Sequence, residues 1–184
     1  MFPVVIDACV LFPFTVRDVL LRAAELDVIA PVWSDRILDE MERNLVARGK
    51  MDVARAAELR EAMVEAFAEA SVPMQQVEAL EAALTNDPKD RHVLAAAIVG
   101  RAEVIVTCNI KDFPRSALAP WRVRAVRPDD YACELLDGWP EEMMESARRQ
   151  VAELRSVATL EELLGLLQHT MPQFADRLRA QFGL

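Results

Sequence analysis

The sequence predicts an α/β fold in which a parallel sheet is flanked by helices, for a chain of 184 residues. Residues 4–6 form a short apolar run that Asp7 ends, typical of a strand covered on both faces, and another strand is expected at residues 103–107. The residues between these two segments have mostly helical periodicity. Strands separated by helices imply parallel pairing with helices on both sides, a three-layer α/β/α arrangement. With 53% hydrophobic residues, the chain can bury a substantial core.

The remaining elements follow from apolar spacing and from turn residues. Two more strands are expected, at residues 28–30, where Pro31 would end the strand, and at 123–126, on an edge of the sheet. Helices are expected at residues 16–26, 34–46, 51–70, 75–84, 91–99, 131–136, 140–156, 160–167 and 174–182. Everything after Pro128 is therefore expected to be helical.

Two helix starts carry recognisable capping residues. Ser34 is expected to cap the helix that buries Ile37, Leu38, Met41 and Leu45, a set with helical spacing. For the helix that ends at residue 99, Asp87 can act as the cap, Pro88 can occupy the first helical position and Asp90 can lie in the first turn.

Acidic residues recur at strand ends and in helices. Asp7 follows the first strand and Asp112 follows the strand at 103–107, while Asp90 opens a helix and Glu40 lies inside one. Ligands of parallel sheets gather at the carboxyl ends of the strands. Carboxylates that converge there repel one another unless a hard cation lies among them, so the pattern predicts a metal site. Helical spacing alone does not select Glu40 over Glu42.

Each acid also has an ordinary structural explanation. An acid after a strand is commonly a solvated loop charge, and Asp112 before Phe113 and Pro114 can simply start a turn. Asp90 at a helix start interacts favourably with the helix dipole, by under about 1 kcal/mol. It is the occurrence of all four acids together that favours the metal site.

Four stretches together resemble PIN-domain ribonucleases, of the kind that serves as the toxin in VapBC-type toxin–antitoxin pairs. They are residues 4–11 (VVIDACVL), 34–40 (SDRILDE), 87–97 (DPKDRHVLAAA) and 104–114 (VIVTCNIKDFP). The resemblance covers residues 1–128, which it implies are a PIN-like nuclease domain. Residues 129–184 would form a helical C-terminal extension, serving as a cover over one sheet face, a dimer contact or a docking surface for the antitoxin.

The resemblance assigns the catalytic and metal-binding roles to Asp7, Glu40, Asp90 and Asp112. It implies hydrolysis of RNA phosphodiesters with Mg²⁺ or Mn²⁺, a homodimer, and a small DNA-binding antitoxin as partner. Asp7 and Asp90 are expected to be the most direct ligands, and Glu40 and Asp112 would bind a second ion or hold its waters. One-ion and two-ion arrangements both stay open. The alternative function is a PIN-like scaffold that binds RNA or protein without cutting.

Further polar residues accompany these acids. Thr107 or Asn109 could orient the attacking water, and Asn109 could be a second polar contact to the ion. Asp87 could contribute to the ligand shell, although capping explains it fully. His92 is expected to pack or to form surface hydrogen bonds, and its use as a general base or metal ligand is the weaker alternative.

The net charge of −9 argues against a generic nucleic-acid binder. Residues 111–127, however, carry five basic residues and one acid, a local charge of +4, whereas residues 129–184 carry −6. Lys111, Arg115 and Arg122 are therefore candidate RNA contacts, although a solvated face explains them equally well. Trp33 and Trp121 are expected to be buried rather than to stack on bases.

Cysteine use and hydropathy suggest a cytoplasmic protein. The three cysteines form no metal-binding spacing, which fits a reducing compartment, and Cys9 and Cys108 are expected to be buried small hydrophobic residues. The N-terminus does not resemble a signal peptide, and no run approaches the ~18 apolar residues of a membrane span.

A phosphatase of the haloacid dehalogenase type would need an acid where Cys9 stands, which makes that class a weak alternative.

Overall fold

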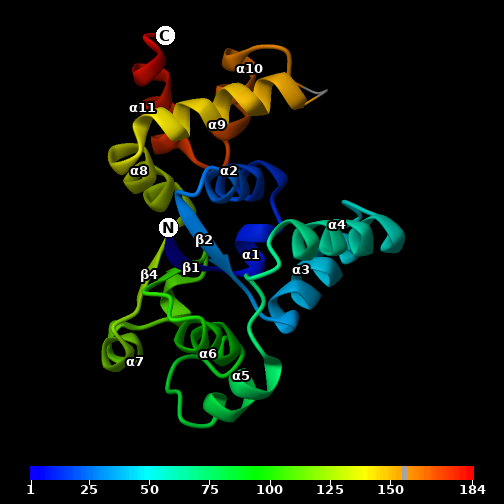
Figure 1. Ribbon diagram of the computed structural model, residues 1–184, viewed down its shortest axis with the longest axis vertical. Coiled ribbons are helices and arrows are strands. Elements are labelled where there is room, and N and C mark those ends of the chain that lie inside the picture. The colour runs from blue at the N-terminus through cyan, green and yellow to red at the C-terminus, as the bar shows by residue number, and fades with distance from the viewer. Residues whose placement is uncertain (155–156) are drawn as a thin grey trace. The chain divides into compact units, whose positions relative to one another are not determined.

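The computed structural model describes residues 1–154 and 157–184. Its sheet has four strands in the order β2-β1-β3-β4 (Figure 1). Their bounds are β1 Phe2–Ile6, β2 Ile29–Val32, β3 Val104–Val106 and β4 Arg124–Val126. β3 pairs in parallel with β1, which places Ile6 beside Val106, and also with β4. The predicted α/β fold, a parallel sheet flanked by helices, is confirmed, as is β4 as an edge strand.

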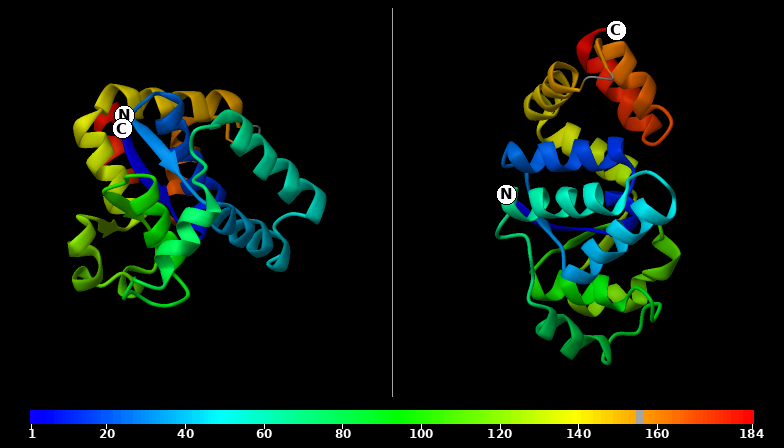
Figure 2. Two further views of the ribbon diagram at one scale, coloured as in Figure 1. Left: turned by 60° about the horizontal axis from the view of Figure 1, so that its bottom comes forward. Right: turned by 90° about the vertical axis from the view of Figure 1, so that its right-hand side faces the viewer.

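Residues 2–12 and 30–126 form one compact unit, which carries most of the sheet. Within it, α6 packs on β1 and β3, α3 packs against α1 and α6, and α4 lies beside α3 (Figure 2). The helices of this unit are α1 Ala8–Leu11, α3 Asp35–Ala47, α4 Val53–Ala66, α5 Met74–Glu81, α6 Arg91–Val99 and α7 Arg115–Leu118, with short 3-10 turns η1 Ile110–Asp112 and η2 Ala119–Trp121.

The cap and the buried face predicted for α3 are confirmed, but the helix predicted at residues 51–70 is longer than α4. The Ser34 hydroxyl accepts a hydrogen bond from the amide of Ile37, and the buried residues of α3 are the four that the spacing predicts. α4 is shorter than residues 51–70 because Asp52 caps its start. The helix ends before Phe67, whose ring lies edge-on against Trp33 with centroids 6.0 Å apart.

Two expectations about prolines are wrong. Pro31 lies inside β2 rather than ending it, which is possible because β2 is an edge strand. Pro88 does not occupy the first position of α6, which begins at Arg91, and the residue at the cap position is Asp90 rather than the predicted Asp87. The carboxylate of Asp87 accepts a hydrogen bond from the amide of Lys89, and this local turn delays the helix.

Residues 13–29 and 127–184, together with Met1, form the second compact unit. Its helices are α2 Phe14–Glu25, α8 Pro128–Gly138, α9 Pro140–Glu153, α10 Leu160–Leu167 and α11 Pro172–Phe182. α2 packs against α8, α9 and α10, and α10 and α11 lie side by side (Figure 2). The last two residues of the helix expected at 140–156 lie outside the described residues.

A polar network joins α2 to α9 within this second unit. Buried Arg22 pairs with Asp18 at 3.1 Å and with Glu153 at 2.9 Å, and the side-chain amide of Gln150 donates to Asp18 at 2.7 Å. A helix from the N-terminal part of the chain is thereby fixed to the C-terminal helices. Among the described residues, no helix has the length and apolar character needed to cross a membrane.

Candidate active site

Asp7 is held by side chains that follow two neighbouring strands. It comes directly after β1 and is only 3% exposed. Its Oδ2 accepts hydrogen bonds from the hydroxyl of Thr107 at 2.6 Å and from the thiol of Cys9 at 3.1 Å. Although Asp7 stands at the N-terminus of α1, its carboxylate makes no capping bond there. The carboxylate is thus fixed by donors from the sheet edge and is not used for helix capping.

Thr107 positions Asp7 rather than a water molecule. It follows β3 and is fully buried. Its oxygen accepts a hydrogen bond from the amide of Asn109 at 3.0 Å, while its single proton goes to Asp7. Asn109 is exposed, so of the two residues considered for orienting a water, Asn109 is the accessible one.

Asp90 and Asp112 belong to adjacent segments. The amide of Asp87 donates to the backbone carbonyl of Asp112 at 3.2 Å, which joins the turn before α6 to the turn η1. Asp90 stands at the N-terminus of α6, where its side chain makes no capping bond. Burial, followed by the charges of Asp7 and Asp112, raises the pKa of Asp90 to about 6. Asp7 and Asp112 thus each disfavour the ionised form of Asp90, and we call these three acids the carboxylate cluster.

Glu40, in contrast, has its own cationic neighbours. Its Oε1 lies 3.6 Å from Nε2 of His92, 3.9 Å from Nε of Arg36 and 3.9 Å from Nη2 of Arg43. Burial opposes its ionisation, but His92 and the two arginines outweigh burial and hold the pKa of Glu40 below its ordinary value. Glu40 is thus an ionised, charge-compensated carboxylate.

Glu40 and Glu42 lie on the same helix but have different partners. Glu42 lies 3.5 Å from Nη1 of Arg60, a residue of α4 that also pairs with Asp35 and Asp39. Glu40 instead contacts His92, which follows Asp90 by two residues on α6. This favours Glu40 as the acid associated with the site.

His92 is fully buried, so the expectation of packing is confirmed and that of surface hydrogen bonding is wrong. Among the described residues, neither ring nitrogen has a hydrogen-bond partner, and the side chain lies next to Glu40. Its position beneath Glu40 suits holding that carboxylate better than contacting a substrate.

The solvent exposure of the basic residues and of the tryptophans bears on their expected roles. Lys111, Arg115 and Arg122 are all exposed, as contacts to RNA would need to be. Trp33 is buried as expected, but Trp121 is 39% exposed, so that expectation is wrong.

The cysteines are also more accessible than the sequence suggests. Cys108 is exposed and Cys9 is only partly buried, so the expectation of burial is wrong for Cys108. The Cys108 side chain and burial raise the pKa of the Cys9 thiol above its usual range. The position of Cys9 two residues after Asp7 was the signal that could have indicated its contact with that acid.

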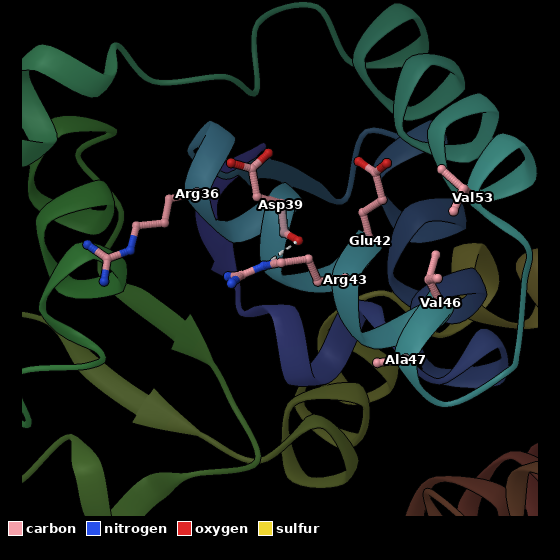
Figure 3. A pocket seen from close by; sticks show the side chains of 7 residues that line it. All are labelled: Arg36, Asp39, Glu42, Arg43, Val46, Ala47 and Val53. Atoms are coloured by element: carbon pink, nitrogen blue, oxygen red, sulfur yellow. Dashed lines mark hydrogen bonds between the residues drawn. The ribbon is translucent and has the colours of Figure 1, made fainter.

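A hollow of about 850 Å³ lies along α3 and the start of α4. Figure 3 shows the side chains that line it, which are Arg36, Asp39, Glu42, Arg43, Val46, Ala47 and Val53. Neither Glu40 nor any member of the carboxylate cluster is among them. The hollow is therefore not part of the candidate metal site.

The chemistry of the donors fits a divalent cation. Carboxylate oxygens are the ligands that Mg²⁺ and Mn²⁺ prefer, and a cation would favour the ionised form of Asp90, which burial and the charges of Asp7 and Asp112 disfavour. As the side chains stand, no three histidine, cysteine or acidic side chains within residues 1–154 and 157–184 come close enough together to enclose an ion.

Two family models match different parts of this chain. Residues 3–111 match the family model described as PIN domain. The chain belongs to the PIN-domain family. Residues 128–180 match a second model, described as VapC50 C-terminal domain.

The chain also resembles a protein of Mycobacterium tuberculosis (strain ATCC 25618 / H37Rv) named "Putative ribonuclease VapC50". The two are 44% identical over 104 residues, which are 56% of this chain and 62% of the relative. The match thus spans less than two thirds of that protein. No solved structure matches this chain.

Replacing Thr107 tests how Asp7 is held. Thr107→Val removes the hydroxyl that donates to Asp7 and leaves a buried charge with one fewer donor. We expect a loss of about 1–3 kcal/mol in the free energy of unfolding, measured by urea denaturation. Thr107→Ser keeps the donor and should lose less. A Thr107→Val protein as stable as the wild type would contradict this role.

Replacing Asp90 tests the repulsion within the carboxylate cluster. The folded protein binds the Asp90 proton more tightly than the unfolded chain does, because its pKa is raised from 3.8 to about 6. The stability associated with this proton is present below pH ~4 and is lost as the pH rises through about 6. Asp90→Asn should therefore stabilise the metal-free protein at pH ~7.5, by under about 1 kcal/mol after solvent screening.

The same substitution should have almost no effect near pH 4, where Asp90 is protonated in the wild type as well. Asparagine is as good a helix N-cap as aspartate, so the start of α6 should be unaffected. Urea unfolding in EDTA at both pH values measures the difference. An equal effect at both would show that the charge of Asp90 is not the cause.

Proposed function

We propose that this protein is a divalent-metal-dependent endoribonuclease, the toxin of a type II toxin–antitoxin pair. The observation that carries the proposal is the carboxylate cluster, in which burial first, and then the charges of Asp7 and Asp112, raise the pKa of Asp90 to about 6. Membership of the PIN-domain family and the name of the relative support it. Acids that disfavour one another's ionisation are costly to hold together unless they serve to bind a cation.

Asp7, Asp90 and Asp112 would hold Mg²⁺ or Mn²⁺, with Glu40 beside them. When bound, the ion would stabilise the negative charge that develops on the phosphate during hydrolysis. Asp7 is kept in place by Thr107 and Cys9. The protein's own side chains would position the water and the RNA.

Glu40 and Asn109 are the groups suited to orient a water molecule. Glu40 is partly exposed and held ionised by His92, Arg36 and Arg43, so it can only accept hydrogen bonds. Asn109 is exposed and offers both an amide donor and a carbonyl acceptor. The Asp87 carboxylate already accepts a hydrogen bond from the amide of Lys89. We therefore assign Asp87 only a supporting role in the ligand shell.

The RNA would be held by the basic segment that follows the cluster. Lys111 lies in η1, Arg115 begins α7, and Arg122 follows η2. All three are exposed, in a segment whose net charge is +4 within an acidic chain. Exposed Trp121, adjacent to Arg122, offers a ring on which a base can stack.

The partners and the domain division belong to the same proposal. We propose a cytoplasmic homodimer inhibited by a small DNA-binding antitoxin. We also propose a nuclease domain of residues 1–128 followed by a helical extension of residues 129–184. The separate matches to residues 3–111 and 128–180 support this division. Because α2 packs with α8, α9 and α10, the extension is anchored on a helix of the proposed nuclease domain.

Incubation with RNA tests the function. Purified protein, free of any partner, should produce RNA fragments with Mn²⁺ and none with EDTA. Asp7→Asn should lower the cleavage rate by at least about 100-fold, because it removes a charged ligand while leaving the fold intact. Asp176→Asn, an exposed acid in the other compact unit, should cleave like the wild type.

Circular dichroism of Asp7→Asn would show that the fold is retained. Cleavage that persists in EDTA, or full activity of Asp7→Asn, would contradict the metal assignment. The absence of any metal-dependent fragments would favour the non-catalytic scaffold.

A further inference from the structure

Two cysteines lie next to each other beside Asp7. β1 and β3 pair so that Ile6 is beside Val106, and Cys9 and Cys108 follow these residues closely. The backbone amide of Cys108 donates to the sulfur of Cys9 at 3.1 Å, and the sulfur of Cys108 lies 3.8 Å from the carbonyl oxygen of Cys9. Each sulfur therefore contacts the backbone of the other cysteine, although the two are 99 residues apart.

We propose that Cys9 and Cys108 are a modification site, at which a hydroperoxide oxidises the two thiols to a reversible disulfide. A disulfide requires Cα atoms within about 7 Å of each other. Contact of each sulfur with the backbone of the other residue fits this requirement. Disulfides of reducing compartments are characteristically transient and redox-sensing.

The exposure of the two side chains sets the order of the steps. Cys108 is exposed and meets the oxidant first, whereas Cys9 is partly buried. Hydrogen peroxide converts the Cys108 thiol to a sulfenic acid and releases one water. The sulfur of Cys9 then attacks the sulfenic sulfur, and the hydroxyl group leaves with the Cys9 proton as a second water. The two thiols lose two electrons in total, and a dithiol reductant returns them.

The disulfide would change the surroundings of Asp7. In the reduced protein the Cys9 thiol donates to Oδ2 of Asp7 at 3.1 Å and lies 3.6 Å from the hydroxyl of Thr107. A disulfide has no S–H group, so Asp7 loses the hydrogen bond from Cys9 and, among the side chains that the structure describes, keeps the one from Thr107. Oxidation should therefore lower the activity, and this consequence, unlike the modification itself, rests on the proposed ribonuclease function.

Cys133 provides an internal control. It is buried in the other compact unit, where its backbone carbonyl accepts a hydrogen bond from Arg177. The proposal predicts that it keeps its thiol under conditions that oxidise Cys9 and Cys108.

Peptide mapping of the full-length protein tests the modification. After treatment with hydrogen peroxide, unfolding and alkylation, mass spectrometry should show a Cys9–Cys108 disulfide and an alkylated Cys133. Dithiothreitol should restore all three thiols. The Cys133→Ser protein should form the same disulfide and the Cys108→Ser protein should not. Three alkylated cysteines, or only higher oxides of Cys108, would overturn the proposal.

Activity measured on the same samples tests the consequence. The oxidised wild type should cleave RNA at least about fivefold more slowly than the reduced protein and recover with dithiothreitol, since Asp7 loses the hydrogen bond from the Cys9 thiol. Cys108→Ser should match the reduced wild type with or without peroxide. A mapped disulfide with unchanged activity would overturn the effect on Asp7. A mapped disulfide in a protein that never cleaves RNA would support the modification and refute the ribonuclease proposal.

Discussion

Electrostatic repulsion among Asp7, Asp90 and Asp112 is the constraint on which the proposed chemistry depends. Parallel pairing of β1 with β3 brings Asp7 and Thr107 together, and a backbone hydrogen bond between Asp87 and Asp112 joins the next two segments. Burial, followed by the charges of Asp7 and Asp112, raises the pKa of Asp90, and the nearby His92 opposes this shift only in part. Holding these negative charges near one another costs free energy of folding. A bound divalent cation would offset that cost.

Glu40 shows that the four acids are not equivalent. His92, Arg36 and Arg43 compensate its charge, whereas burial and neighbouring carboxylates dominate the surroundings of Asp90. Buried His92 connects the two, since it lies on α6 two residues after Asp90 and contacts Glu40 on α3. The packing of α3 against α6 therefore fixes where Glu40 stands relative to the start of α6. This supports different roles for Glu40 and the carboxylate cluster.

Features encoded by neighbouring residues could be predicted from the sequence, and those set by tertiary contacts could not. The Ser34 cap and the buried face of α3 follow from local spacing, as does the strand that precedes Asp7. The inclusion of Pro31 in β2 depends on that strand lying at an edge, and the pairing of Glu40 with His92 depends on helix packing. The exposure of Cys108 and Trp121 likewise depends on what covers them, which composition does not reveal.

The most direct test of the central claim is the titration of the Asp90 side-chain carboxyl group by carbon-13 NMR, with and without Mg²⁺. The account predicts a midpoint at about pH 6 in the metal-free protein, because burial and the neighbouring carboxylates favour the protonated form. Added Mg²⁺ should move that midpoint well below this value, since a cation favours the ionised form. A midpoint near the ordinary 3.8 that Mg²⁺ leaves unchanged would contradict the account.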